Sequence, residues 1–249
     1  MRDFTLAMYR NLISSLMSQD IYTVKSYFLT HPEKGLILRH DVDISPEKAL
    51  RMAQIDHDLG VQSTYYFRYP KTFDPDILKK IAAMGHEVGY HYEVLDKTQG
   101  NIEEAMKIFR HELALFRTCV DVQTVSMHGG VLTKYDNRDI WKKNKFSDYG
   151  ILGEPYISMD YTKIHYFTDT GRDWSGRYSV KDLVEKSHPL LHNVKSTTDL
   201  IQLLKKSESE LFFLTIHPKR WSSNTVEWLS ELAIQSTKNI GKSFLKIKG

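Results

Sequence analysis

The sequence lacks most of the features that would set it apart from ordinary soluble proteins. It has one cysteine, Cys119, in 249 residues, which excludes an internal disulfide and any zinc module built from several cysteines. No segment approaches the roughly 20 consecutive apolar residues that a membrane-spanning helix needs. The 34 basic side chains nearly balance the 31 acidic ones, and a net charge of +3 gives no indication of a nucleic-acid partner. We therefore expect a cytoplasmic protein with no membrane span and no bound nucleic acid.

The two common phosphate-binding motifs are also missing. No GxGxxG follows the first predicted strand, and no GxxxxGK[ST] occurs anywhere in the chain. Internal repeats, low-complexity tracts and long linkers rich in proline, glycine or serine are absent as well. Since 41% of the residues are hydrophobic, the chain can bury one large core. We expect a single domain over residues 1–249, with an amphipathic N-terminal helix at about 1–30 packed outside it.

Strand-like and helix-like segments alternate along most of the chain. Strands are predicted over residues 35–43, 62–69, 86–93, 122–130, 164–170 and 211–218. Helices are predicted over residues 45–60, 74–85, 101–118 and 225–238. The first two of these helices begin with a capping residue followed by proline and end at a glycine. Repeated strand–helix units predict the α/β class with a parallel sheet, either open or closed into a barrel.

The first predicted strand, LILRHDVD, ends in an unusual concentration of titratable groups. Asp41 and Asp43 are two residues apart, so they share one face of the strand, and His40 points to the other. Active sites of parallel α/β proteins form at this carboxyl edge of the sheet. One aspartate could simply cap the next helix, but Ser45 and Pro46 already supply that signal. We interpret the aspartate pair as functional.

Three further strand ends carry histidine. His91 and Glu93 share a face in GHEVGYHYE, His128 precedes two glycines in SMHGG, and His217 ends LTIHP. Imidazole and carboxylate groups with open positions suit zinc or a similar first-row ion. A metal held in this way polarises a carbonyl and activates water, while a free carboxylate and a histidine transfer protons. The pattern predicts a hydrolase that uses a divalent transition metal, with Zn²⁺ the expected ion.

Four motifs together resemble those of the polysaccharide deacetylase superfamily, the NodB-like proteins of carbohydrate esterase family four. They are LILRHDVD, GHEVGYHYE, DTGRDW and LTIHP, in this order, and the resemblance covers about residues 35–220. The sequence is most similar to the divergent branch with an HDVD first motif, which is associated with bacterial surface-glycan synthesis. The resemblance implies a distorted (β/α)7-type barrel. It also implies a metal-dependent hydrolase that removes N- or O-acetyl groups from a glycan or sugar derivative.

The resemblance also implies roles for single residues. Asp41 matches the general base of the family and Asp43 its metal-binding aspartate. His91 matches the first histidine of the metal motif, and His217 matches the histidine that acts as general acid. Asp169 lies in the segment that tunes this acid. Trp174 is expected to wall the acetyl pocket, and Arg172 in the same segment is expected to contact the substrate. Apart from the resemblance, Tyr92 is one of several aromatic candidates for a sugar platform, with packing in the core as the alternative.

Two positions depart from the family pattern. The second histidine of the metal motif would stand four residues after His91, where this sequence has Leu95. An Arg-Pro segment that forms the third motif is replaced by SMHGG. The third metal ligand would then be Glu93 or His128, and we favour His128 because the glycines after it suggest a crowded mouth. The alternative is a deacetylase fold whose catalysis has lapsed and which binds a glycan or serves in its assembly.

Overall fold

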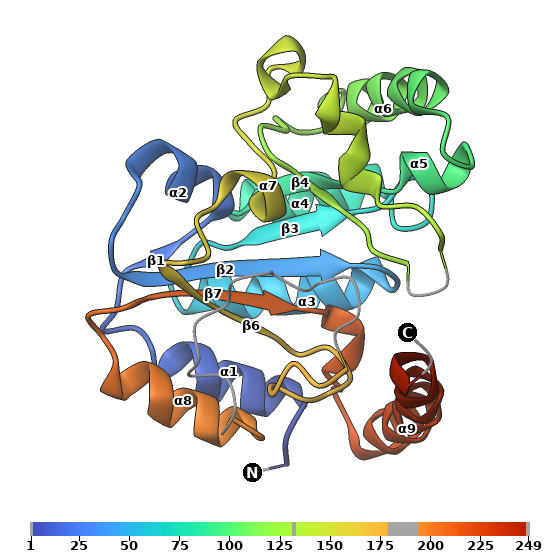
Figure 1. Cartoon of the computed structure of the whole chain (residues 1–249). Helices are drawn as coiled ribbons and strands as arrows, with labels where there is room; N and C mark the ends of the chain where they lie inside the picture. Colours follow the sequence, from blue (N-terminus) through green and yellow to red (C-terminus); the bar gives the residue numbers. More distant parts are fainter. Residues whose placement is uncertain (1, 131–132, 179–193, 248–249) are drawn as a thin grey trace.

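The computed structural model describes residues 2–130, 133–178 and 194–247 (Figure 1). Its strands are β1 (Ile21–Tyr22), β2 (Gly35–Val42), β3 (Thr64–Phe67), β4 (Glu87–Tyr92), β5 (Val125–Met127), β6 (Ile164–Thr168) and β7 (Leu211–Ile216). Its α-helices are α1 (Leu6–Ser14), α2 (Val24–Thr30), α3 (Pro46–Asp58), α4 (Pro75–Ala83), α5 (Val94–Lys97), α6 (Ile102–Arg117), α7 (Pro155–Ser158), α8 (Thr197–Lys206) and α9 (Thr225–Ile247). Short 3₁₀ helices are η1 (Asn137–Lys142), η2 (Phe146–Tyr149) and η4 (Pro218–Arg220).

Within the described residues, seven strands form one parallel sheet. The order is β5-β4-β3-β2-β7-β6, and β1 adds to β2 beside this path. The sheet curls, but in the described part of the chain no ladder joins its two end strands, β5 and β6. The barrel is therefore not closed, and the sheet forms a half-barrel. Because all the strands are parallel, their carboxyl ends meet at one edge, which lies toward α9 in Figure 1. The predicted α/β class and distorted (β/α) barrel are confirmed in this half-barrel form.

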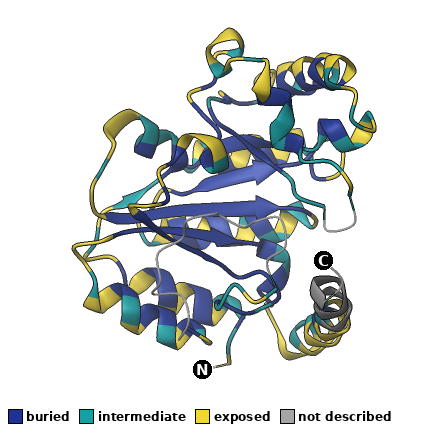
Figure 2. Ribbon diagram, in the orientation of Figure 1, coloured by how far each residue is buried: buried dark blue, intermediate teal, exposed yellow. Residues whose placement is uncertain are grey.

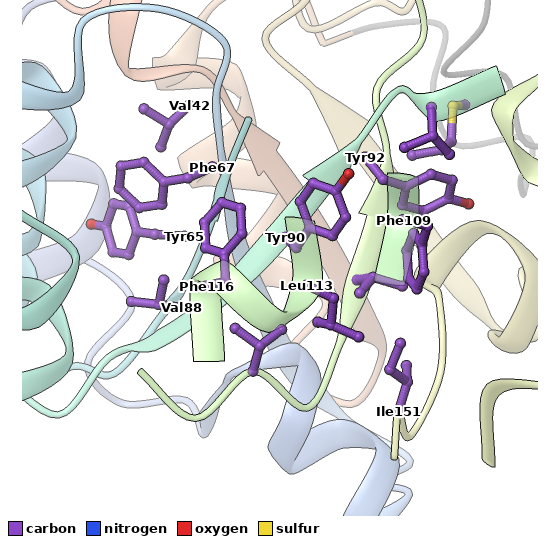
Figure 3. Packing of buried hydrophobic residues seen from close by; sticks show 14 of the residues in the cluster. Val42, Tyr65, Phe67, Val88, Tyr90, Tyr92, Phe109, Leu113, Phe116 and Ile151 are labelled. Atoms are coloured by element: carbon purple, nitrogen blue, oxygen red, sulfur yellow. The ribbon is translucent and has the colours of Figure 1, made fainter. Parts of the chain in front are cut away.

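The two faces of the sheet have different surroundings. We call the face covered by α1, α3, α4, α6 and α8 the outer face, and the opposite one the inner face. Strands β2 to β7 are buried along their whole length, and the two residues of β1 are half-buried (Figure 2). On the outer face, Tyr90 of β4 packs against Phe109 and Phe116 of α6, and Tyr65 of β3 lies in the same hydrophobic cluster (Figure 3). Full burial of a large apolar side chain contributes about 1.5–3 kcal/mol to the stability of the folded protein.

The N-terminal segment forms two helices instead of the single helix expected at about 1–30. Thr5 caps α1 by accepting a hydrogen bond from the Met8 amide, and Thr23 caps α2 through the Ser26 amide. Between them, β1 pairs with β2, so this part of the chain belongs to the sheet as well as to its cover. Across the described residues, no helix is both long and apolar enough to cross a lipid bilayer.

A polar network lies buried beneath α1 and α3 on the outer face. The Asp56 carboxylate accepts hydrogen bonds from Tyr9 (2.6 Å), Tyr65 (2.7 Å) and Ser63 (2.7 Å). His40 Nε2 lies 2.8 Å from the Tyr9 hydroxyl, and the imidazole stacks on Tyr65. Burial lowers the pKa of His40 to about 3 and raises the pKa of Asp56 to about 6. His40 is therefore neutral in the folded protein at every pH where Asp41 beside it would work.

This network predicts a pH dependence of stability. Below pH 6.5 the unfolded chain protonates His40 and the folded protein does not, so acid lowers the free energy of unfolding by about 1.4 kcal/mol per pH unit. Asp56 acts in the opposite sense, because its folded pKa lies above its unfolded value. His40→Gln removes the first contribution and keeps the second. The stability difference between wild type and His40→Gln should therefore shrink by about 2 kcal/mol from pH 7 to pH 5.

Urea unfolding at pH 5, 6, 7 and 8 measures this difference. His111→Gln, at an exposed position of α6, is the matched control and should follow the wild type at each pH. A difference between wild type and His40→Gln that stays constant with pH would show that His40 titrates alike in the folded and unfolded chain.

Candidate active site

Five of the side chains predicted to be functional converge at the carboxyl edge of the sheet. Asp41 lies in β2 and Asp43 just after it, and His91 lies in β4. His128 follows β5, and His217 follows β7. Since β4, β3, β2 and β7 are consecutive neighbours in the sheet, residues that are far apart in the sequence meet at one edge. Contacts of 3.6–3.8 Å join Asp41, Asp43, His91 and His128, and the charge of His217 lowers the pKa of both aspartates.

Asp41 is fixed by a buried arginine two residues earlier on the same face. The Arg39 guanidinium donates two hydrogen bonds to the carboxylate, at 2.7 and 2.8 Å, and neither side chain is more than 5% exposed. The Tyr66 and Tyr156 rings lie 5.1 and 4.8 Å from the guanidinium carbon. Burial alone would raise the pKa of Asp41, but the Arg39 charge outweighs it and holds that pKa below its usual value. Asp41 is thus an ionised carboxylate at neutral pH.

Asp43 is contacted on both of its carboxylate oxygens. Oδ1 lies 3.7 Å from His91 Nε2 and 3.6 Å from His128 Nε2, and Oδ2 accepts a hydrogen bond from the Lys219 ammonium group. Burial opposes ionisation of this carboxylate, but Lys219 and the histidines hold its pKa well below the usual value. Ser45, which was expected to cap α3, stands at the N-cap position but makes no side-chain capping hydrogen bond. The carboxylate of Asp43 is bound to Lys219.

His91 is oriented by the strand next to it. Its Nδ1 lies 3.0 Å from the Ser126 carbonyl oxygen in β5, and a carbonyl can only accept, so Nδ1 carries the proton. The other nitrogen, Nε2, then faces Asp43 at 3.7 Å and Asp41 at 3.8 Å. A backbone carbonyl that fixes the tautomer of a histidine is the support that metal-binding histidines usually have.

His128 and Glu93, the two candidates for a third metal ligand, lie one behind the other. Glu93 Oε2 is 3.1 Å from His128 Nδ1 and also accepts a hydrogen bond from Arg68. Burial would raise the pKa of Glu93, but His128 and Arg68 together lower it to about 2. His128 Nε2 therefore faces Asp43, and Glu93 stands behind it. Leu95, at the position of the family's second histidine, is 3% exposed and packs in the outer-face core.

The kinds of donor in this cluster suit zinc, but their arrangement does not. One carboxylate and two imidazole nitrogens are suitable zinc ligands, at about 2.0–2.2 Å from the ion. In the structure, however, Lys219 occupies one oxygen of Asp43. Among residues 2–130, 133–178 and 194–247, no group of three His, Cys, Asp or Glu side chains is placed to hold a metal ion. Zinc therefore stays a prediction from the sequence.

His217 is held by a buried carboxylate. Its Nδ1 lies 2.6 Å from Asp169 Oδ1, and its backbone N–H donates to Asp169 Oδ2 at 2.9 Å. Arg220 donates to Oδ1 at 2.6 Å and Trp221 to Oδ2 at 2.8 Å, so both oxygens of the fully buried Asp169 are shared. Burial would raise the pKa of Asp169, but Arg220 and His217 hold it well below the usual value. The imidazole of His217 is thereby fixed with Nδ1–H on Asp169.

His217 also lies next to Asp41. Their strands, β7 and β2, are neighbours whose last paired residues are Ile216 and His40. One residue further along each strand, His217 and Asp41 both point to the inner face, and the charge of His217 lowers the pKa of Asp41. An ionised carboxylate and an imidazole, each fixed by a buried partner, thus stand side by side.

Tyr92, which was expected to contact a sugar, lies in the core instead. It follows His91 directly, so it points to the outer face, where it is fully buried beside Phe109 (Figure 3). Its hydroxyl accepts a hydrogen bond from Trp141 Nε1 at 3.0 Å. The role of Tyr92 is therefore packing, and the sugar-binding prediction is corrected.

Trp174 and Arg172 also make their contacts outside the cluster of Asp41, Asp43, His91, His128 and His217. Trp174 is fully buried in the outer-face core, where its Nε1 donates to Thr197 at 3.0 Å and its ring stacks on Phe4. The Arg172 guanidinium lies over the rings of Phe4 (5.3 Å) and Trp228 (5.1 Å). The structure does not bring these two predicted substrate contacts to Asp41 and His217.

Sequence reasoning missed Arg39, Lys219, Arg220 and Trp221. Arg39 carried a signal, because a charged residue in an otherwise apolar strand, two residues before Asp41, must share its face. The other three follow His217 directly in HPKRW, but only the tertiary structure reveals that they contact Asp43 or Asp169.

No protein-family model matches the chain, and no curated protein matches its sequence. Solved structures that it resembles include an esterase and a pseudoenzyme of family CE4. An esterase of this family from Streptococcus mutans aligns over 94% of this chain and 91% of its own, with 14% identity and a TM-score of 0.49. The peptidoglycan deacetylase PdaC from Bacillus subtilis aligns over 87% of this chain and 98% of its own, with 14% identity and a TM-score of 0.41.

A CE4 pseudoenzyme from Bacillus anthracis is similar over 82% of this chain, with 14% identity and a TM-score of 0.43. The aligned region spans 61% of that pseudoenzyme's length.

Proposed function

We propose that the protein is a hydrolase of the deacetylase kind, which removes an N- or O-acetyl group from a glycan or sugar derivative in surface-polysaccharide metabolism. The observation that carries the proposal is the pairing of Asp41 with His217 on neighbouring strand ends. Each is fixed by a buried partner, Arg39 for the carboxylate and Asp169 for the imidazole. A protein that only binds a glycan has no need of a fixed base beside a fixed acid.

Asp41 acts as the general base in this reaction. Its carboxylate is ionised, and the Arg39 fork leaves it no freedom to turn away from the inner face. It takes a proton from a water molecule as the water oxygen forms a bond to the acetyl carbonyl carbon. A positioned base of this kind contributes about 10²–10⁴-fold to the rate.

His217 acts as the general acid. The Asp169 carboxylate accepts a hydrogen bond from His217 Nδ1–H, which leaves Nε2 as the nitrogen that gives a proton to the leaving group. The bond between the acetyl carbon and the sugar nitrogen or oxygen breaks as that atom takes the proton. Acetate and a free amine or hydroxyl are the products, and water supplies the added atoms.

A second candidate function is that of a glycan-binding protein whose catalysis has lapsed. The ion pair between Lys219 and Asp43 favours it, because it engages the carboxylate that the sequence assigns to a metal ion. The burial of Leu95 where the family has a metal-binding histidine points the same way.

An acetate-release assay on purified protein tests the proposal. We expect acetate from at least one member of a panel of N-acetylated and O-acetylated oligosaccharides, assayed without and with added zinc. If no acetate is released from any member of the panel, with or without zinc, and an oligosaccharide binds measurably, the glycan-binding function is favoured.

A further inference from the structure

We infer that the ammonium group of Lys219 is the resident cation of this site and keeps divalent metal ions from Asp43. The inference concerns which cation the site holds and not the reaction that the site performs. It can therefore fail or stand whether or not the protein releases acetate.

The geometry around Asp43 is that of a cation site with its cation supplied by the chain. His91 Nε2 and His128 Nε2 approach the same oxygen, Oδ1, at 3.7 and 3.6 Å. The second oxygen, Oδ2, accepts a hydrogen bond from Lys219 Nζ. A metal bound between the carboxylate and the imidazoles would sit next to this ammonium group. Two cations at that separation repel each other, so the metal can bind only after Lys219 has moved.

The backbone that carries Lys219 is anchored on both sides. On one side, His217, two residues before Lys219, is bound to Asp169 through both backbone and side chain. On the other side, Trp221 donates to the same carboxylate. The Lys219 carbonyl accepts a hydrogen bond from Lys48 Nζ at 3.0 Å. These contacts hold the turn of η4 in place, so that only the lysine side chain is free to leave Asp43.

The ion pair is also shielded from solvent. The Lys219 side chain is 21% exposed and the Asp43 side chain 11% exposed. Exposed ion pairs contribute little, but separating a shielded pair leaves each charge without a partner in a poorly solvated place. Moving Lys219 away from Asp43 therefore costs free energy, and this cost weakens the binding of a metal ion at the site.

Zinc titration by isothermal calorimetry tests the inference, with wild type beside Lys219→Met and Lys219→Arg. Methionine keeps an unbranched side chain without the charge, and we expect that variant to bind one zinc ion at least about tenfold more tightly than the wild type, a difference of about 1.4 kcal/mol. Lys219→Arg retains a cation and should stay as weak as the wild type. The control is Lys97→Met, because Lys97 is similarly shielded (27% exposed) and pairs with Glu112 at 2.7 Å. This control should leave zinc affinity unchanged.

The gain in zinc affinity of Lys219→Met must depend on Asp43. Adding Asp43→Asn to Lys219→Met should abolish the tighter binding. The inference is overturned if wild type and Lys219→Met bind zinc equally well, or if neither binds it. Should Lys219→Met fail to fold, wild-type crystals soaked in zinc decide the matter by anomalous diffraction. Zinc density at Asp43 overturns the inference, and Lys219 Nζ at Asp43 without zinc supports it.

Discussion

Replacing His217 with alanine should lower kcat for acetate release by about 10²–10⁴-fold and leave KM nearly unchanged. The reason is that Asp169 holds the imidazole with one nitrogen engaged, so that the other can protonate the leaving group. The loss falls on kcat because this proton transfer takes place in the transition state and contributes little to binding of the ground state. Steady-state kinetics on the oligosaccharide that the wild type hydrolyses fastest provides the measurement.

A matched control is His165→Ala. His165 is also a buried strand histidine with a carboxylate partner, Glu210 at 3.3 Å, but it lies near the amino end of β6. Its replacement should leave kcat within a few-fold of the wild type. A His217→Ala protein that keeps its fold and more than half of its activity would exclude His217 as the acid.

Replacing Asp41 with asparagine should abolish activity and also destabilise the fold. The substitution removes the base and leaves Arg39, which is fully buried, without its counter-ion. Breaking a buried charge pair in this way costs about 3–5 kcal/mol. Chemical denaturation measures the free energy of unfolding, and the acetate assay at a temperature where the variant is folded measures the activity.

A double-mutant cycle separates the two effects. Arg39→Met alone should also be strongly destabilised, since it leaves Asp41 buried and unpaired. The double variant Arg39→Met/Asp41→Asn should lose less stability than the sum of the two single variants, because no charge is then left alone. The double variant should remain inactive. Additive losses of stability would mean that the two side chains are not coupled as the structure has them.

Strand alternation and the shared edge of a parallel sheet made most of the site predictable. Asp41 and Asp43 had to share a face, and His40 had to lie on the other, where it joins the Asp56 network. His91 could be placed beside the aspartates because consecutive parallel strands end at the same edge. The same alternation excludes Tyr92, which is adjacent to His91 and must point the opposite way.

Contacts made by long side chains could not be predicted from the sequence. Lys219 reaches Asp43 across 176 positions of the chain, and Arg220 reaches Asp169 across 51. No local pattern distinguishes these residues from the solvated basic side chains elsewhere on the surface. The arrangement of His128 and Glu93 could not be predicted for the same reason, because the Glu93 carboxylate contacts both His128 and Arg68.

The helices α2 and α8 could not be predicted from the hydrophobic pattern of the sequence. An amphipathic pattern over the first residues predicted one helix, but capping by Thr23 starts a second one after the short strand β1. The helix α8 begins with a capping box formed by Ser196 and Asp199, a signal that lies in a stretch without clear periodicity before it. In both cases a capping residue marks where the helix begins, and the hydrophobic pattern did not predict that helix.

The measurement that tests the central claim most directly is the yield of acetate, with the matching free amine or hydroxyl, from an acetylated oligosaccharide. It compares the wild type with the double variant Asp41→Asn/His217→Gln. We expect the wild type to release acetate and the sugar product in equal amounts, and the folded double variant to release neither above the uncatalysed rate. Equal yields from the two proteins, or none from either, would contradict the assignment of Asp41 and His217 as the base and the acid of a deacetylase.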